Sequence, residues 1–310
     1  MARFHNPHIR NAQRSLWHFL LWKAGYYKET KSPLPVDFSY PVQAPLFQPE
    51  LPSALWVGHA TFLIEIGGVH LLTDPVWSDH CSPVPIRALR RRHEPPLPLS
   101  DLPPIDYVLL SHNHYDHLDL RTVQHLRVFH PEIEWIVPAG VKRWFLRQGI
   151  ERVTELAWWQ THSSSKGTVT ALPAQHFSGR SLWDKNRTHW NGYLFEKNGK
   201  KFYFTGDTGY NSCDFRAIGA QFAPIDLSLI PIGTYLPKEF MAPVHCSPDE
   251  AVKIHQEVGS RLSLGMHWKT FCLSEEPMSQ PPYDLFLAMQ EKNLPLESFL
   301  PIEPGVQINW

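Results

Sequence analysis

The chain has 310 residues, with 29 Lys and Arg against 30 Asp and Glu, and a formal net charge of −1. This near-neutral balance excludes the broad positive field of a general nucleic-acid binder, so no nucleic-acid partner is expected. A hydrophobic fraction of 43% is ample for a buried interior and excludes disorder over most of the chain. The four cysteines form no C-x-x-C pair, which argues against a disulfide scaffold and fits a reducing, cytoplasmic location.

The first region, residues 1–53, is expected to hold one helix and a proline-rich strap. The apolar run at residues 16–22 is far shorter than the roughly 20 residues that span a bilayer. Cations flank this bulky aromatic run, so its helix either packs on the protein or on a second subunit, or lies peripherally on a membrane surface. Six prolines between residues 31 and 53 disfavour helix and favour an extended connection to the rest of the chain.

Residues 54–310 are predicted to form one α/β domain, because short apolar runs alternate with helical patterns. The predicted strands are residues 61–66, 69–73, 107–110, 134–137, 168–173, 192–196, 201–205, 227–229 and 262–266. The predicted helices are residues 120–130, 140–148 and 247–258. Hairpin turns are expected at Gly67-Gly68 and Asn198-Gly199. The third helix opens with Ser247, Pro248 and Glu250, the pattern of a capping box.

Four potential metal ligands follow the predicted strand at 107–110 within one short turn. His112 and His114 are two residues apart in near-extended backbone, so both rings can point to one side. Asp116 and His117 follow where the chain turns toward the next helix, so one loop can feed two adjacent metals. Imidazole and carboxylate suit zinc, with iron or manganese as alternatives, and the lack of a cysteine here argues against a structural thiolate site.

Three further ligand-type residues, His176, Asp207 and His267, each lie just past a predicted strand. A single histidine in such a place is usually an ordinary core or surface residue. The ordered set of four segments, each ending a strand, instead favours a metal site built from strand ends.

The order H-x-H-x-D-H, then His, Asp and His, resembles the metallo-β-lactamase superfamily, whose hydrolase domains are αβ/βα sandwiches with metals at the sheet edges. The resemblance implies one metal bound by His112, His114 and His176. It implies a second metal bound by Asp116, His117 and His267, with Asp207 bridging the two.

Longer segments resemble the N-acylphosphatidylethanolamine-hydrolysing phospholipase D family. The segments that carry this resemblance are residues 56–61, 103–106, 111–119, 206–210, 231–235, 250–255 and 267–271. The similarity runs from about Pro45 to Leu273, and the chain before Pro45 shows no sure match. It implies a zinc phosphodiesterase, a phospholipid substrate, the products phosphatidic acid and N-acylethanolamine, and a homodimer.

Two metals about 3.5–4 Å apart can share a hydroxide that attacks phosphorus, with Asp116 or Asp207 orienting it. The resemblance places His245 near the substrate phosphate, where it would donate a hydrogen bond or protonate the leaving alkoxide, against a merely structural role. His59 and Asp74 are expected to support the metal loop rather than to bind metal. Cys246 and Cys272 are interpreted as small buried apolar groups.

Two charged segments have two interpretations each. The run Arg87, Arg90, Arg91 and Arg92 would meet anionic headgroups or form a solvated loop. Residues 180–190 mix cations with two tryptophans just after His176, which predicts a substrate-facing lip. The composition of this lip also suits single-stranded nucleic acid, which the neutral overall charge disfavours.

Fold and metals do not choose the substrate. The alternatives are a soluble phosphodiester or lactone hydrolase on the same scaffold, a metal-binding or lipid-binding protein without turnover, and a di-iron redox protein. The complete ligand set argues against lost activity, and the absence of a flavin-binding domain argues against the redox protein.

Overall fold

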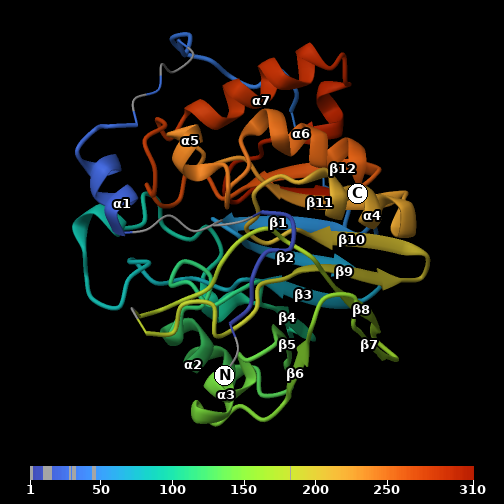
Figure 1. Ribbon diagram of the computed structural model, residues 1–310. Helices are drawn as coiled ribbons and strands as arrows, with labels where there is room; N and C mark the ends of the chain where they lie inside the picture. The colour runs from blue at the N-terminus through green and yellow to red at the C-terminus, as the bar shows by residue number, and fades with distance from the viewer. Residues whose placement is uncertain (1–2, 10–15, 28, 30–32, 44–46, 182) are drawn as a thin grey trace.

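The computed structural model of the protein describes residues 3–9, 16–27, 29, 33–43, 47–181 and 183–310. Two seven-stranded sheets pack face to face, and helices cover the outer face of each sheet (Figure 1). The layers therefore run helix, sheet, sheet, helix, which confirms the predicted αβ/βα sandwich.

The first sheet combines an antiparallel meander with a parallel half. In spatial order it consists of β14 (Gln307–Asn309), β1 (Ser53–Gly58), β2 (Thr61–Ile66), β3 (Val69–Thr73), β4 (Tyr107–Leu109), β5 (Glu134–Pro138) and β6 (Val153–Leu156). Strands β3 to β6 pair in parallel, so their carboxyl ends reach the same edge. The β2–β3 turn uses Gly67 and Gly68, both at positive φ, as the sequence predicts.

The second sheet repeats this division. In spatial order it consists of β13 (Phe299–Leu300), β12 (Ser260–Met266), β11 (Ile225–Pro231), β10 (Lys200–Phe204), β9 (Gly192–Lys197), β8 (Gly167–Leu172) and β7 (Thr161–Ser164). Strands β10 to β13 pair in parallel, whereas β7 to β10 form an antiparallel meander. The predicted Asn198-Gly199 turn joins β9 to β10, again with both residues at positive φ.

Two groups of helices cover the sheets (Figure 1). The first sheet carries α2 (Leu120–Phe129) and α3 (Lys142–Arg147), and the second carries α4 (Ser212–Phe222), α5 (Lys238–Met241), α6 (Pro248–Glu257) and α7 (Gln280–Glu291). Helix α6 begins with the predicted capping box between Ser247 and Glu250. The sequence interpretation did not include α4, α5, α7 or the strands β1, β6, β7, β13 and β14.

The inner faces of the two sheets form one apolar core, in which Trp56, Phe62 and Tyr203 are fully buried. A second core lies between the first sheet and helices α2 and α3. Strand β4 is therefore covered on both faces, which explains its uninterrupted apolar sequence. All four cysteines are free, and Cys246 is fully buried as expected, while Cys272 is only partly buried.

The N-terminal region meets its predictions in part. Helix α1 (Leu16–Lys23) packs on the protein through Trp22, whose ring stacks on Phe240 at a centroid distance of 4.9 Å. Trp17 and Leu20 are 65% and 50% exposed, so one side of the helix faces solvent. No helix within the described residues has the length and hydropathy needed to cross a bilayer. The described residues between 33 and 52 contain neither helix nor strand, as their prolines predict.

Candidate metal centre

All seven predicted ligand residues lie at strand ends on the edge where the two sheets meet. The loop after β4 carries four of them, and α2 begins directly behind it with Asp119 as its N-cap. His176, Asp207 and His267 follow β8, β10 and β12 in the opposite sheet. Gly206, at positive φ, lets the Asp207 turn lie close to Ser111 at the end of β4. A Cβ at residue 206 would lie 2.7 Å from the Cβ of Ser111.

The first set of ligand residues is His112, His114 and His176, whose rings converge. The Nε2 atom of His112 lies 2.8 Å from Nδ1 of His114, and Nε2 of His176 lies 3.3 Å from the same atom. His112 and His176 are each 1% exposed. These three nitrogens belong to one group of candidate ligand atoms that all lie within 4.8 Å of one another.

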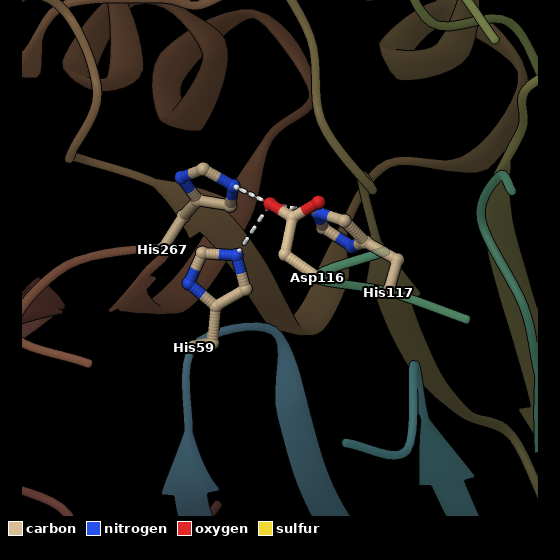
Figure 2. Close-up of side chains that lie close together, drawn as sticks. All are labelled: His59, Asp116, His117 and His267. Atoms are coloured by element: carbon tan, nitrogen blue, oxygen red, sulfur yellow. Dashed lines mark hydrogen bonds and ion pairs between the residues drawn. The ribbon is translucent and has the colours of Figure 1, made fainter. Parts of the chain in front are cut away.

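The second set is Asp116, His117 and His267, which Figure 2 shows around the Asp116 carboxylate. Asp116 Oδ2 lies 3.3 Å from Nε2 of His117 and 3.6 Å from Nε2 of His267. Both imidazole side chains are fully buried, whereas the Asp116 side chain is 14% exposed. Asp116 is therefore the ligand candidate of this set that solvent or substrate can reach.

Asp207 lies between the two sets. Its Oδ2 is 3.2 Å from Nε2 of His117, 3.1 Å from Nε2 of His267 and 3.8 Å from Nε2 of His176. One carboxylate therefore reaches ligand atoms of both sets, the position that a bridging ligand needs. The other oxygen, Oδ1, is buried and has no hydrogen-bond partner.

The protonation pattern of the first set fits metal binding. The Nδ1–H groups of His112 and His176 donate to Ser111 Oγ and to the carbonyl of Val244, which leaves both Nε2 lone pairs facing the site. Burial lowers the pKa of His114 to about 3 and of His176 to about 4, with neighbouring histidines opposing a proton on His114 as well. Neutral imidazole is the form that binds a metal.

At the second set, Asp116 and the neighbouring Asp207 are ionised, and their negative charge favours a cation between them. Although burial opposes it, the His117 ring holds the pKa of the Asp116 and Asp207 carboxyls well below their usual range. Burial also opposes a proton on His267, but Asp207 raises the pKa of this histidine to about 9. His117 Nε2 and His267 Nε2 are buried without hydrogen-bond partners. Two clusters of histidine and aspartate, joined by Asp207, are thus suited to a dinuclear metal site.

Asp74 supports ligands of both sets from behind. Its carboxylate accepts from Nδ1–H of His117 at 2.6 Å, and from the hydroxyl and the backbone N–H of Ser111. Ser111 in turn accepts from His112, so one fully buried carboxylate orients two ligand rings. The supporting role expected for Asp74 therefore agrees with its contacts.

His59 supports the second set in two ways. Its Nε2–H donates to Asp116 Oδ2 at 3.0 Å (Figure 2), and its carbonyl accepts from the backbone N–H of His267 at 3.0 Å. The His59 backbone N–H donates to Thr270 Oγ1 at 2.7 Å. These contacts hold His59 at φ +54 and His267 at φ +63, left-handed conformations that cost about 1–3 kcal/mol each in residues other than glycine.

His245 lies beside the two sets. Its Nδ1 is 3.9 Å from Asp207 Oδ2, and its ring centroid is 5.0 Å from that of His176. Burial lowers the pKa of His245 well below its usual range, so the ring is neutral and carries one N–H donor. This Nδ1 atom is buried without a partner.

The predicted lip after His176 is fastened to the metal loop by Arg180, which the sequence analysis did not single out. The Arg180 guanidinium donates to the carbonyls of Asn113 and Leu118 and lies 3.8 Å above the Tyr115 ring. Within the lip, Trp183 is 78% exposed, whereas Trp190 is buried. Only part of this segment therefore faces outward.

The arginine run does not form one exposed surface. Arg87, Arg90 and Arg92 are exposed, but Arg91 is 7% exposed and donates to the carbonyls of Val76 and Ser78. The inclusion of Arg91 in a surface charge run was therefore wrong. Its role is to hold the loop that follows β3.

The sequence profile described as "Beta-lactamase superfamily domain" matches residues 70–268. The solved metallo hydrolase Igni18 from Ignicoccus hospitalis shares the fold, with a TM-score of 0.62 and 19% identity over 84% of this chain and 98% of its own. Fold and site together define the class of protein as a metal-dependent hydrolase of the metallo-β-lactamase superfamily.

Two relatives narrow the class. N-acyl-phosphatidylethanolamine-hydrolyzing phospholipase D 1 of Caenorhabditis elegans is 39% identical over 81% of this chain and 74% of its own length. The mitochondrial protein of that name from Saccharomyces cerevisiae is 36% identical over 73% of this chain, which spans 49% of the yeast protein. The chain therefore belongs to the N-acyl-phosphatidylethanolamine-hydrolysing phospholipase D family, which confirms the resemblance seen in its motifs.

Proposed function

We propose that the protein is a phosphodiesterase that hydrolyses N-acylphosphatidylethanolamine to phosphatidic acid and an N-acylethanolamine. The observation that carries this proposal is the convergence of two ligand sets on Asp207, at distances of 3.1 to 3.8 Å. Membership of the phospholipase D family supports the substrate class. In the reaction, water adds its oxygen to phosphorus, the bond to the ethanolamine oxygen breaks, and that oxygen takes up a proton.

The proposed cofactor is a pair of Zn²⁺ ions, with iron or manganese as the alternatives. Five of the seven ligand residues are histidines, and none is a cysteine, a donor set that suits zinc. Two such cations would supply positive charge at the phosphate and lower the pKa of a water molecule toward about 7.

The protein's own groups would orient substrate and water. The partly exposed Asp116 is placed to accept a proton or hydrogen bond from the attacking water, with Asp207 as the alternative. The neutral His245 ring, 3.9 Å from Asp207, is suited to donate a hydrogen bond to the phosphate or to the leaving oxygen. Asp74 and His59 would keep the ligands preorganised.

We also propose peripheral contact with an anionic membrane. The support is a set of exposed apolar side chains near cations: Trp17 and Leu20 on α1, and Val84 and Ile86 beside Arg87. Basic residues near an anionic surface contribute about 1 kcal/mol each, and salt screens this contribution. Vesicle co-sedimentation should therefore weaken as salt is raised, and failure to bind anionic vesicles at low salt would leave α1 as packing alone.

The substrate assignment is tested by comparing kcat/KM on four compounds with one metal-replete preparation. The compounds are N-acylphosphatidylethanolamine, unacylated phosphatidylethanolamine, bis(p-nitrophenyl) phosphate and a simple lactone. Each buried methylene contributes about 0.8 kcal/mol before ordering costs, so the N-acylated lipid should be preferred many-fold. Equal efficiency on the soluble ester or the lactone would favour the alternative function, a soluble phosphodiester or lactone hydrolase, and reject the lipid assignment.

A further inference from the structure

Residues 3–9, named here the N-terminal strap and distinct from the proline-rich strap that follows α1, run without regular secondary structure along the edge of the candidate metal centre. Its first attachment is to the lip. The backbone N–H of Phe4 donates to the Asn186 carbonyl at 2.9 Å, and the Asn186 amide donates back to the Phe4 carbonyl at 3.2 Å. The Phe4 ring also stacks on His189 at a centroid distance of 4.4 Å. The His189 ring in turn packs on the Trp158 ring, with a centroid distance of 4.4 Å.

The second attachment is to a candidate metal ligand. Asn6 is 9% exposed, whereas its neighbours His5 and Pro7 are exposed. Its side-chain amide donates to the backbone carbonyl of His176 at 2.8 Å. His176 is thus held at its main chain by Asn6 and at its ring by the Val244 carbonyl.

The third attachment reaches the second helical layer. Nε2 of His8 lies 3.2 Å from Oδ1 of Asp214 on α4, with the His8 side chain 36% exposed. The strap therefore connects the lip, the end of β8 and α4 within a few residues. Terminal segments are usually poorly ordered unless such contacts hold them.

Loss of the buried Asn6–His176 hydrogen bond should affect the site, whereas loss of the exposed His8–Asp214 pair should not. Loss of the Asn6 amide would leave the His176 carbonyl buried without its partner, which a folded chain relieves by moving the main chain. The His176 Nδ1–H donates to the Val244 carbonyl on a separate segment, so a shift of the His176 main chain tilts the ring about that fixed contact. Loss of the exposed His8–Asp214 pair has no comparable route to the site.

We propose that the N-terminal strap is an integral part of the metal centre and that Asn6 is a positioning residue for His176. The inference rests on the proposed role of His176 as a ligand of the first metal. It predicts that the strap acts on one of the two metal positions, because within the described residues 3–9 its contact with the ligand sets is with His176.

The test uses the full chain with Asn6→Leu, which keeps the side-chain size and removes the donor. The matched control is His8→Ala, which removes the exposed attachment of the same strap. The measurements are metal content, the rate of zinc release to a chelator, and Tm. We expect Asn6→Leu to release one of two metals about 10-fold faster, the lower end of the usual effect of a group that orients a ligand. Its Tm should fall by no more than a few degrees, the effect of one lost buried hydrogen bond, whereas His8→Ala should keep its Tm and release metal like the wild type.

Three results would overturn the proposal, and they are distinguishable. Wild-type release kinetics in Asn6→Leu, with two metals bound, would show that the strap does not position His176. A large fall in Tm with both metals released equally would mean that Asn6 only stabilises the fold. A wild-type chain that holds no metal would instead refute the ligand assignment itself, before any variant is compared.

Discussion

The two ligand sets differ in how the surrounding chain supports them. In the second set, a single residue contacts two members: His59 contacts Asp116 through its ring and His267 through its carbonyl. In the first set, each supported histidine has its own partner: Ser111 for His112, and Val244 with Asn6 for His176. His114 is the least buried histidine of the first set. Its ring packs edge-on against Phe177, with a centroid distance of 4.5 Å.

Some supporting groups contact both ligand sets, and others contact one. Asp207 reaches both sets directly, and Asp74 reaches both through His117 and Ser111. His59 and Asn6, in contrast, each contact one set. Substitutions should therefore divide into those that disturb both metals and those that disturb one.

The largest effect is expected from Asp207→Ala, because one carboxylate reaches both sets. Metal content should fall at both positions, and turnover should fall by at least about 10²–10³, as for loss of a major electrostatic group. Elemental analysis and steady-state kinetics measure this. Asp226→Asn, a buried carboxylate of the second sheet paired with Lys200 and Arg261, is the control. Full metal content with near-normal turnover in Asp207→Ala would remove the bridging role.

His114→Ala should affect one position. The variant should keep about one metal per chain, because His117, His267 and Asp116 still form the second set. Turnover should fall by a similar factor of about 10²–10³, because the proposed reaction uses both cations. Loss of both metals in this variant would show that the two positions do not fill independently.

A smaller effect is expected at His59. His59→Ala should weaken metal binding at the second position about 10-fold to 100-fold, the usual effect of removing a group that orients a ligand. His59→Gln should recover part of this, because its amide N–H can donate to Asp116. His255→Gln is the control, because His255 is a buried histidine on α6 whose ring contacts the Ser263 hydroxyl on β12, away from both ligand sets. Unchanged metal affinity in His59→Ala would show that Asp116 needs no such support.

The smallest effect is expected at the lip. Trp183 is 78% exposed, so Trp183→Ala should leave metal content and Tm unchanged. Its KM for a lipid phosphodiester should rise a few-fold, while kcat/KM on bis(p-nitrophenyl) phosphate should stay the same. An equal change on both substrates would mean that the lip does not contact acyl chains.

The strands that carry the site were predictable, because a strand covered on both faces shows as an apolar run that ends at a polar residue. Strand β4 and the loop behind it are the clearest case. Helix α4 was missed, since Gly219 lowers its helix propensity. That glycine is required there, because a Cβ would collide with the carbonyl of Glu257 on α6. Helix α7 was missed as well, and the two prolines at its start read as a break.

Motif order pointed to the seven ligand-type residues that converge at this edge, and it pointed only in part to the groups that contact them. Asp74 and His59 lie in motifs that indicate support of the metal loop, and their contacts are with Ser111, His117 and Asp116. Nothing near Asn6 in the sequence indicates its contact, because its partner His176 is 170 residues away. The Arg180 contacts with the metal loop were equally invisible, since they depend on how the lip folds back over Tyr115.

The central claim is that these side chains hold two metals around Asp207. Anomalous diffraction from crystals of the protein loaded with zinc tests this most directly. The account predicts two peaks per chain, about 3.5–4 Å apart as in other dinuclear sites. One peak should lie among His112, His114 and His176, the other among Asp116, His117 and His267, with Asp207 between them. A single peak, or peaks remote from Asp207, would contradict the account.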